Sequence, residues 1–238
     1  MKTGYCLQRT ADPDIAEIAA LIGERGRAAM LMALLDGREL TASELALRAG
    51  MSPQAATAHL KKLAAAGLLA VRPAGRNRFF RIGSAEVGHA VEGLAAIAPP
   101  ARIVALGQST ALERLRRARS CYDHLAGELG VGVTHRFIER GAIVNRGSAF
   151  ELTPSGERLL HEFGIDVERA RAQRRSFART CLDWTQRRPH LAGSLGASVF
   201  DLFLRNSWVT RSSSERSLRV TPEGRHALEA HFGLTWRD

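Results

Sequence analysis

The sequence has no long hydrophobic run. In its 238 residues no stretch approaches the roughly 18 consecutive apolar residues that a membrane-spanning helix needs. The N-terminal segment MKTGYCLQRTADPD also lacks the apolar core of a signal peptide. The hydrophobic fraction of 45% is nevertheless sufficient to build real cores. We therefore expect a cytoplasmic protein with no membrane partner.

Cysteine is scarce, and the common enzyme motifs are missing. The three cysteines, Cys6, Cys121 and Cys181, are an odd number in a chain without an export signal, which argues against a disulfide framework. The sequence contains no GxGxxG after a predicted strand, no phosphate-binding GxxxxGK, no HExxH and no GxSxG. Without these motifs, the sequence gives no support to an enzymatic function.

Positive charge, in contrast, is in excess. The chain has 34 Lys and Arg against 24 Asp and Glu, a formal net charge of +10. Basic side chains release condensed counterions from a phosphate backbone, so this excess suits a nucleic acid partner. Many arginine-rich proteins from GC-rich genomes share this bias without binding nucleic acid. The local sequence pattern must therefore decide whether this chain binds nucleic acid.

The first half of the chain predicts a series of short helices. Apolar residues at helical spacing between Asp12 and Gly37 predict two of them. Thr41, with a glutamate three residues on, starts a capping box that opens a third helix, which Gly50 ends. After a tight turn, Ser52 caps a fourth helix with Pro53 at its first position.

A basic hairpin follows these helices. The segment LLAVRPAGRNRFFRIG predicts strand, turn and strand, with Arg72, Arg76 and Arg78 near the tip. A fifth helix, SAEVGHAVEGLAAIA, then runs to the break at Pro99. Helices followed by a basic hairpin are the order of a winged helix-turn-helix, whose second motif helix enters the major groove of DNA.

The stretch ELTASELALRAGMSPQAATAHLKKLAAAGLLAVRPAGRNRFFRI resembles the ArsR-type regulators. It shares their small helix, serine-containing turn, helix ending HLKKLxxAGLL and hairpin with arginine before an aromatic residue. The resemblance covers about Asp12 to Pro99. It implies a transcriptional repressor that binds double-stranded DNA as a homodimer on a pseudo-palindromic operator, with the fifth helix pairing with the first to form the dimer.

The resemblance also implies where DNA is contacted. Amide and hydroxyl groups at the front of the fourth helix suit base edges or phosphates, and basic groups there and on the hairpin suit phosphates or the minor groove. For the two lysines a solvated helix face is an equal alternative. The candidates are Ser52, Gln54, Thr57, His59, Lys61, Lys62, Arg76 and Arg78.

The usual metal sites of ArsR-like proteins are largely absent. Their third helix often carries a cysteine pair, in a pattern like ELCVCDL, where this chain has SELALRAG. Arsenite or cadmium sensing at that helix is therefore not expected. On the fifth helix only His89 and Glu92 suggest the family's second site, and a surface or interface histidine is the favoured interpretation.

The second half of the chain repeats itself. After a connecting helix at 101–120, two copies cover about 121–165 and 181–234. Each copy is expected to run helix, LAGxLG turn, helix, strand, turn, strand, and then a helix opened by TPxG, an element that resembles the wing-to-helix step of MarR-like proteins. The matched positions are Cys121 with Cys181, Asp123 with Asp183, His124–Gly127 with His190–Gly193, Thr153-Pro154 with Thr221-Pro222, and Phe163-Gly164 with Phe232-Gly233.

The expected fold is therefore mainly α with small β-hairpin wings. A winged helix-turn-helix domain for DNA binding and dimerisation occupies residues 1–100. An internally duplicated, winged-helix-like region over 121–238, with its copies packed about a pseudo-twofold, would serve as an effector or oligomerisation domain.

The duplication suggests a metal or effector site. Cys121 and His124 are expected one turn apart on a helix, and Cys181 with His190 repeats the residue types. A twofold packing would assemble two thiolates and two imidazoles, a set that suits zinc or another thiophilic ion. The alternative is that the cysteines are small buried apolar residues and the histidines support the turns. The candidate residues are Cys121, Asp123, His124, Cys181, Asp183 and His190.

Two other classes of function stay open. One is an enzyme fused to the winged-helix domain. Cys121, Asp123 and His124 are too close together to form an obvious nucleophile, base and orienting group, although a partner from the second copy could complete such a set. The other is a purely structural module that stiffens the dimer. The effector itself is not named by the sequence.

Overall fold

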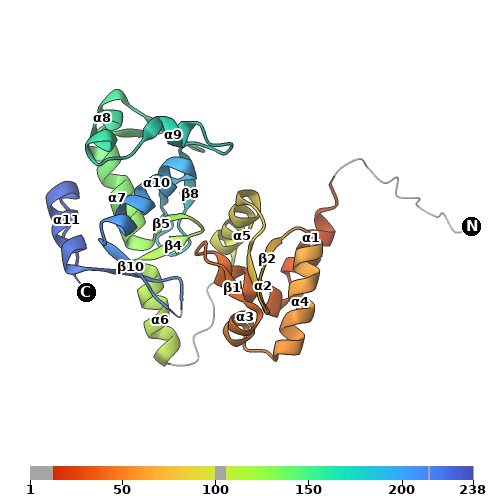
Figure 1. Ribbon diagram of the computed structural model, residues 1–238. Helices are drawn as coiled ribbons and strands as arrows, with labels where there is room; N and C mark the ends of the chain where they lie inside the picture. Colours follow the sequence, from red (N-terminus) through yellow and green to blue (C-terminus); the bar gives the residue numbers. More distant parts are fainter. Residues whose placement is uncertain (1–12, 100–105, 214, 238) are drawn as a thin grey trace, which may run out of the picture.

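The structure of the protein, a computed structural model, describes residues 13–99, 106–213 and 215–237 (Figure 1). Residues 13–99 form one hydrophobic core and residues 106–237 form a second, larger one. We call these the N-terminal part and the C-terminal part. Within the described residues no helix is long and apolar enough to cross a membrane.

The N-terminal part is a winged helix-turn-helix, as expected. Its elements are α1 (Ile15–Ile22), α2 (Arg25–Leu34), β1 (Leu40–Thr41), α3 (Ala42–Ala49), α4 (Pro53–Ala65), β2 (Leu69–Ala74), β3 (Asn77–Ile82) and α5 (Ala85–Ile97). The three strands form one antiparallel sheet in the order β1-β3-β2. The β2–β3 hairpin is the wing.

Local capping explains why the helix-turn-helix forms where the sequence predicts it. Thr41 caps α3, and its side chain and that of Glu44 make both hydrogen bonds of a capping box. Gly50 ends α3 in the left-handed conformation, with φ 63°. The Ser52 hydroxyl then accepts a hydrogen bond from the Ala55 amide to start α4, the helix that would enter the major groove.

The C-terminal part contains the same order of elements twice. After α6 (Leu106–Arg117) come β4 (Arg119–Cys121), β5 (His124–Ala126), α7 (Gly127–Glu139), β6 (Ile143–Asn145), β7 (Phe150–Leu152) and α8 (Pro154–Glu162). A short α9 (Val167–Arg171) leads to β8 (Arg179–Leu182), β9 (Pro189–Ala192), α10 (Gly193–Arg205), β10 (Val209–Arg211), β11 (Leu218–Val220) and α11 (Pro222–Phe232). Each strand pair is a two-stranded antiparallel sheet, and apolar residues of both runs share one core.

The expectation that each copy opens with a helix is wrong. α6 ends at Arg117, and Cys121 and His124 lie opposite each other across the β4–β5 hairpin. Tyr122 has a φ of 55°, a conformation that a helix cannot contain and that permits the tight turn. The strand residues Arg119 to Cys121 are all buried, so they show no alternation that would distinguish a short strand from a helix in sequence.

The TPxG motif of each copy does open a helix, and its glycine has a steric reason. The hydroxyls of Thr153 and Thr221 accept hydrogen bonds from the amides of Gly156 and Gly224, at 3.0 and 2.9 Å. A Cβ atom at Gly224 would clash with the main-chain carbonyl of Trp208, and Gly156 is in the same situation against Ala142. The glycine therefore lets the helix start lie directly on the turn before the second hairpin.

Replacing Gly224 with alanine is expected to lower the free energy of unfolding by about 1–3 kcal/mol, because the added methyl group overpacks against rigid backbone. Gly107→Ala is the control, since a Cβ there would meet nothing within 4 Å. Urea unfolding followed by circular dichroism measures both. Equal midpoints for the two variants would contradict this account of the motif.

Candidate metal centre and nucleic-acid interface

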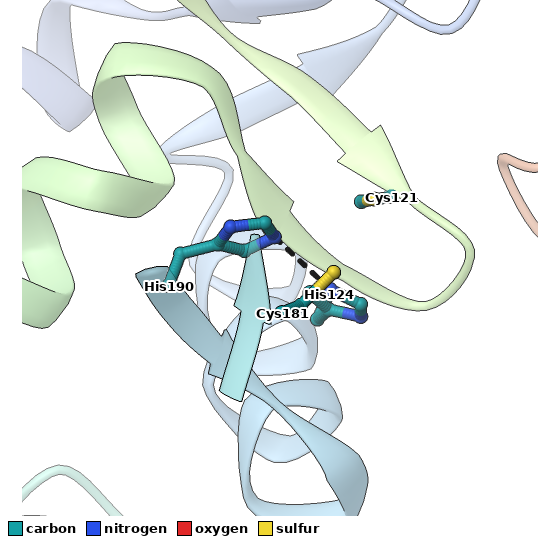
Figure 2. Close-up of side chains that lie close together, drawn as sticks. All are labelled: Cys121, His124, Cys181 and His190. Carbon is teal, nitrogen blue, oxygen red and sulfur yellow. Dashed lines mark hydrogen bonds between the residues drawn. The ribbon is translucent and has the colours of Figure 1, made fainter. Parts of the chain in front are cut away.

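The two Cys/His pairs of the C-terminal part come together in one buried cluster (Figure 2). Cys121 pairs with His124 across β4–β5, and Cys181 pairs with His190 across β8–β9. One side-chain atom from each of the four residues lies within 4.8 Å of all the others. We call this set the Cys/His cluster.

Both hairpins place their pairs in the same way. In each, the cysteine and the histidine are directly opposite cross-strand neighbours, so their side chains project from the same face of the hairpin. The residues that end the second strands, Ala126 and Ala192, are fully buried and pack with the two cysteines. These small side chains leave room for the hairpins to approach closely.

The geometry of the cluster suits a tetrahedral metal ion. Nε2 of His124 lies 3.2 Å from Nε2 of His190. Two imidazole nitrogens bound to one tetrahedral zinc ion at about 2.0–2.1 Å would lie about 3.3–3.4 Å apart. The four side chains have exposed fractions of at most 5%, so an ion held here would be shielded from water.

The surroundings of the two histidines differ. Nδ1 of His124 lies 3.3 Å from a carboxylate oxygen of Asp123, which is itself ion-paired with Arg175. A carboxylate behind a histidine is the usual arrangement that orients a metal-ligating imidazole. Nδ1 of His190 is buried and has no hydrogen-bond partner among the described residues.

Charges and burial shift the proton affinities in the cluster. Burial opposes protonation of His124, but the carboxylate of Glu92 and hydrogen bonds to Asp123 and Cys181 outweigh it and raise the pKa of His124 to about 10. Burial lowers the pKa of His190. The hydrogen bond between the two thiols lowers the pKa of Cys181 and raises that of Cys121. The two cysteines thus differ in proton affinity, and binding of a soft cation would favour their deprotonated forms.

A carboxylate outside the four-residue set, which the sequence analysis did not assign to this site, lies beside the Cys/His cluster. Oε2 of Glu92, on α5 of the N-terminal part, lies 3.5 Å from Sγ of Cys181, and burial raises the pKa of Glu92 to about 7. His89, one turn earlier, is partly buried with its ring 6.3 Å from that of Tyr122. The sequence showed that His89 and Glu92 lie one turn apart on this helix, but it did not show which hairpins they contact.

Asp183 holds the two repeats together. It forms a fully buried ion pair with Arg119 of β4, with 2.8 Å between Nη2 and Oδ2. The same oxygen accepts a hydrogen bond from the amide of Gly127 at 2.7 Å, and its other oxygen accepts from Thr185 and Gln186. Both oxygens of Asp183 are therefore occupied by these contacts. Asp123, in contrast, lies beside the Cys/His cluster.

The winged-helix residues expected to contact DNA are mostly on the surface. Ser52, Gln54, Thr57, Lys61 and Lys62 are exposed on α4, and Arg76 and Arg78 are exposed on the wing. The Thr57 hydroxyl donates a hydrogen bond to the Pro53 carbonyl at 2.8 Å.

His59 differs from the other candidates on α4. Its Nδ1 lies 3.5 Å from Glu24 and 3.3 Å from Arg27, and 24% of its side chain is exposed. The ring therefore joins α4 to the start of α2 and presents less of itself to a DNA groove than its neighbours do.

Comparison with known proteins places the chain in a family. YdfF of Bacillus subtilis (strain 168), an uncharacterized HTH-type transcriptional regulator, is 39% identical over 223 residues, which span 94% of this chain and 99% of that one. This chain belongs to the HTH-type transcriptional regulators. A model of the MarR family matches residues 24–78 of this HTH-type regulator. That model covers the helix-turn-helix and part of the wing, which related winged-helix families share, so the ArsR-type assignment made from the sequence is not confirmed.

Solved structures resemble part of this HTH-type regulator. Reduced HlyU from Vibrio cholerae N16961 is 28% identical, with 36% of this chain and 90% of that chain covered and a TM-score of 0.33. The transcriptional repressor BigR from Xylella fastidiosa is 20% identical, with 37% and 88% covered and a TM-score of 0.34.

Replacing Asp183 with asparagine is expected to lower the free energy of unfolding by about 3–5 kcal/mol, because the buried Arg119 guanidinium loses its counter-ion. The control is Asp201→Asn, which removes an exposed ion pair to Arg205 on α10. Such surface pairs contribute little, so its thermal midpoint should stay near that of the wild type. If both variants melted like the wild type, the Arg119–Asp183 pair would not hold the repeats together.

Proposed function

We propose that this HTH-type regulator is a metal-responsive repressor. It binds double-stranded DNA as a homodimer on a pseudo-palindromic operator, and its effector is a thiophilic divalent ion such as zinc, held by Cys121, His124, Cys181 and His190. The observation that carries the proposal is the buried Cys/His cluster in a chain whose N-terminal part is a winged helix.

Exposed polar and basic groups on α4 and the wing support DNA binding. Gln54 and Thr57 lie on the exposed front of α4, where amides and hydroxyls read base edges or bind phosphates. Arg76 and Arg78 lie at the tip of the wing, in position to follow the phosphate backbone. The net charge of +10 strengthens this attraction.

Exposed apolar residues on α1 and α5 support a homodimer. α1 has no buried residue, and Ile15 on it is 79% exposed. On α5, Leu94 and Ile97 are 44% and 78% exposed. Large exposed apolar side chains on both helices suit an interaction surface. The homodimer that we propose is built from α1 and α5, as in ArsR-type regulators.

The repeated order of elements supports a duplicated effector domain at 121–238. Each run supplies one cysteine and one histidine from the same positions of its first hairpin, and the cluster lies where the two hairpins meet. Four protein ligands of this kind fill a tetrahedral shell and leave no open position for substrate. This favours a sensing or structural ion and a regulator that is not an enzyme.

The first test of the proposal concerns DNA. Genomic fragments bound by the purified protein are recovered, and the best fragment is titrated in gel shifts at several salt concentrations. Gln54→Ala combined with Thr57→Ala is expected to weaken binding about 10- to 100-fold, because base contacts are lost. Arg76→Ala should reduce the slope of log affinity against log salt concentration by about one, because one phosphate contact is lost.

The matched control is Arg205→Ala, which removes an exposed arginine of α10 and should leave affinity and salt dependence unchanged. Binding of the wild type that is weak and equal for all fragments, and indifferent to Gln54 and Thr57, would exclude the repressor function.

The second test concerns the metal. Protein purified under reducing conditions without chelator and supplied with zinc is expected to retain about one ion per chain, as measured by elemental mass spectrometry. Zinc should also raise the melting temperature, because a ligand that binds only the folded state stabilises it. The double variant Cys121→Ser with Cys181→Ser should lose both effects, while Cys6→Ser should keep them. Equal metal content in the wild type and the double variant would exclude this site.

A further inference from the structure

One face of α5 is held by the two hairpins that form the Cys/His cluster. The ring of Tyr122 packs on Gly88, where an added Cβ would come within 3.0 Å of the ring. Sγ of Cys181 lies 3.5 Å from Glu92. Further along, the guanidinium of Arg187 donates a hydrogen bond to the carbonyl of Ala96 at 2.7 Å. Gly88, Glu92 and Ala96 are four residues apart and therefore share one face of the helix; we call it the 88–92–96 face.

The outer two of these contacts come from the hairpin turns. Tyr122 lies in the turn between Cys121 and His124, and Arg187 lies in the loop between Cys181 and His190. Tyr122 also donates its amide hydrogen to the carbonyl of Leu35 at 2.6 Å. The cluster residues and the segments that touch the N-terminal part therefore lie on the same short hairpins, and in Figure 1 the β4–β5 side of the C-terminal part faces α5.

Glu92 of α5 lies next to an arginine of the second hairpin whose counterpart in the first hairpin pairs with a residue of the C-terminal part itself. Arg119 in the first hairpin pairs with Asp183 of the second. Arg179 occupies the corresponding position in the second hairpin, but it lies 3.7 Å from Glu92 of α5, while Asp123 pairs with Arg175. The symmetry of the C-terminal part is thus broken at the point where α5 inserts its carboxylate.

Several polar atoms at the contact between α5 and the hairpins have no hydrogen-bond partner among the described residues. Oε1 of Glu92, Nε2 of His89 and Nε of Arg179 are buried without a hydrogen-bond partner among the described residues. Buried polar atoms without partners are rare in folded proteins and call for an explanation. An interface with a second arrangement, in which these atoms are paired differently, provides one.

Metal binding would change the dimensions of the cluster. Its ligand atoms now lie up to 4.8 Å apart. A tetrahedral zinc ion with Zn–S bonds of about 2.3 Å requires its two sulfurs to lie about 3.8 Å apart. Binding would fix the separation of the two sulfurs, and any adjustment of the hairpins toward that separation would displace Cys181 relative to Glu92 and both turns relative to α5. Packed interfaces convert such small shifts into a change between discrete arrangements.

We propose that the 88–92–96 face transmits the metal occupancy of the Cys/His cluster to the DNA-binding part, with Glu92 as the positioning residue. This inference rests on the metal binding proposed above. The helix that receives the signal also carries the exposed Leu94 and Ile97, so a shift of α5 alters the surface proposed for the dimer, and through it the spacing of the two recognition helices.

The test is hydrogen–deuterium exchange of the full chain with and without zinc, read in peptides that span α5. In the wild type, zinc is expected to change the exchange rates of α5 by about tenfold, a typical coupling between sites. Glu92→Gln keeps the shape of the side chain but removes its charge, and it should bind zinc at the same ratio while the change in α5 is lost. Arg187→Ala, a substitution in an exposed loop, should reduce the change, and the neighbouring Arg188→Ala should not.

The outcomes separate the two proposals. If the wild type binds no zinc, the proposed function fails. If zinc binds but exchange in α5 is unchanged, or changes equally in the wild type, Glu92→Gln and Arg187→Ala, the metal site stands and the coupling through α5 is wrong. If Glu92→Gln itself loses zinc or does not fold, the comparison of Arg187→Ala with Arg188→Ala decides.

Discussion

The buried ion pair between Arg119 and Asp183 holds the C-terminal part in the arrangement that its chemistry needs. It joins β4 of the first run to the loop after β8 of the second, and the same carboxylate binds the amide that begins α7. A buried charge left alone is very costly, so the two hairpins have few other ways to pack. With this register set, the Cys/His pair of one hairpin faces that of the other.

The closeness of these four side chains has consequences on both sides of the cluster. Within it, two thiols and two imidazoles without access to water are matched to a soft cation better than to any other group. Outside it, the same hairpins end in turns that contact α5 and the end of α2. In the proposed function, this single set of short strands would both carry the metal ligands and contact the winged helix, which would let a site remote from α4 affect DNA binding.

Sequence reasoning succeeded where structure depends on neighbours along the chain. Thr41, Gly50 and Ser52 mark the helix-turn-helix because caps are made within a few residues. The TPxG helices were recognised for the same reason. It failed at Cys121, which lies on a hairpin and not on a helix, because its strand is fully buried and is held through Arg119 by the distant Asp183 rather than marked by a local pattern. Glu92 was visible as a residue of the fifth helix, but its burial depends on a hairpin 89 residues away.

The sequence by itself determined the winged helix, the polar and basic residues of α4 and the wing, and the recurrence of Cys, Asp and His in the second half, since caps, turns and residue types are properties of short segments. Only the tertiary structure decided that the two Cys/His pairs meet, that Asp183 is an ion-pair partner, that His59 packs against α2 and that Glu92 belongs beside Cys181. The physical reason is that these contacts join residues far apart in the chain, and their partners are selected by burial and charge compensation in the folded core, which no short-range pattern records.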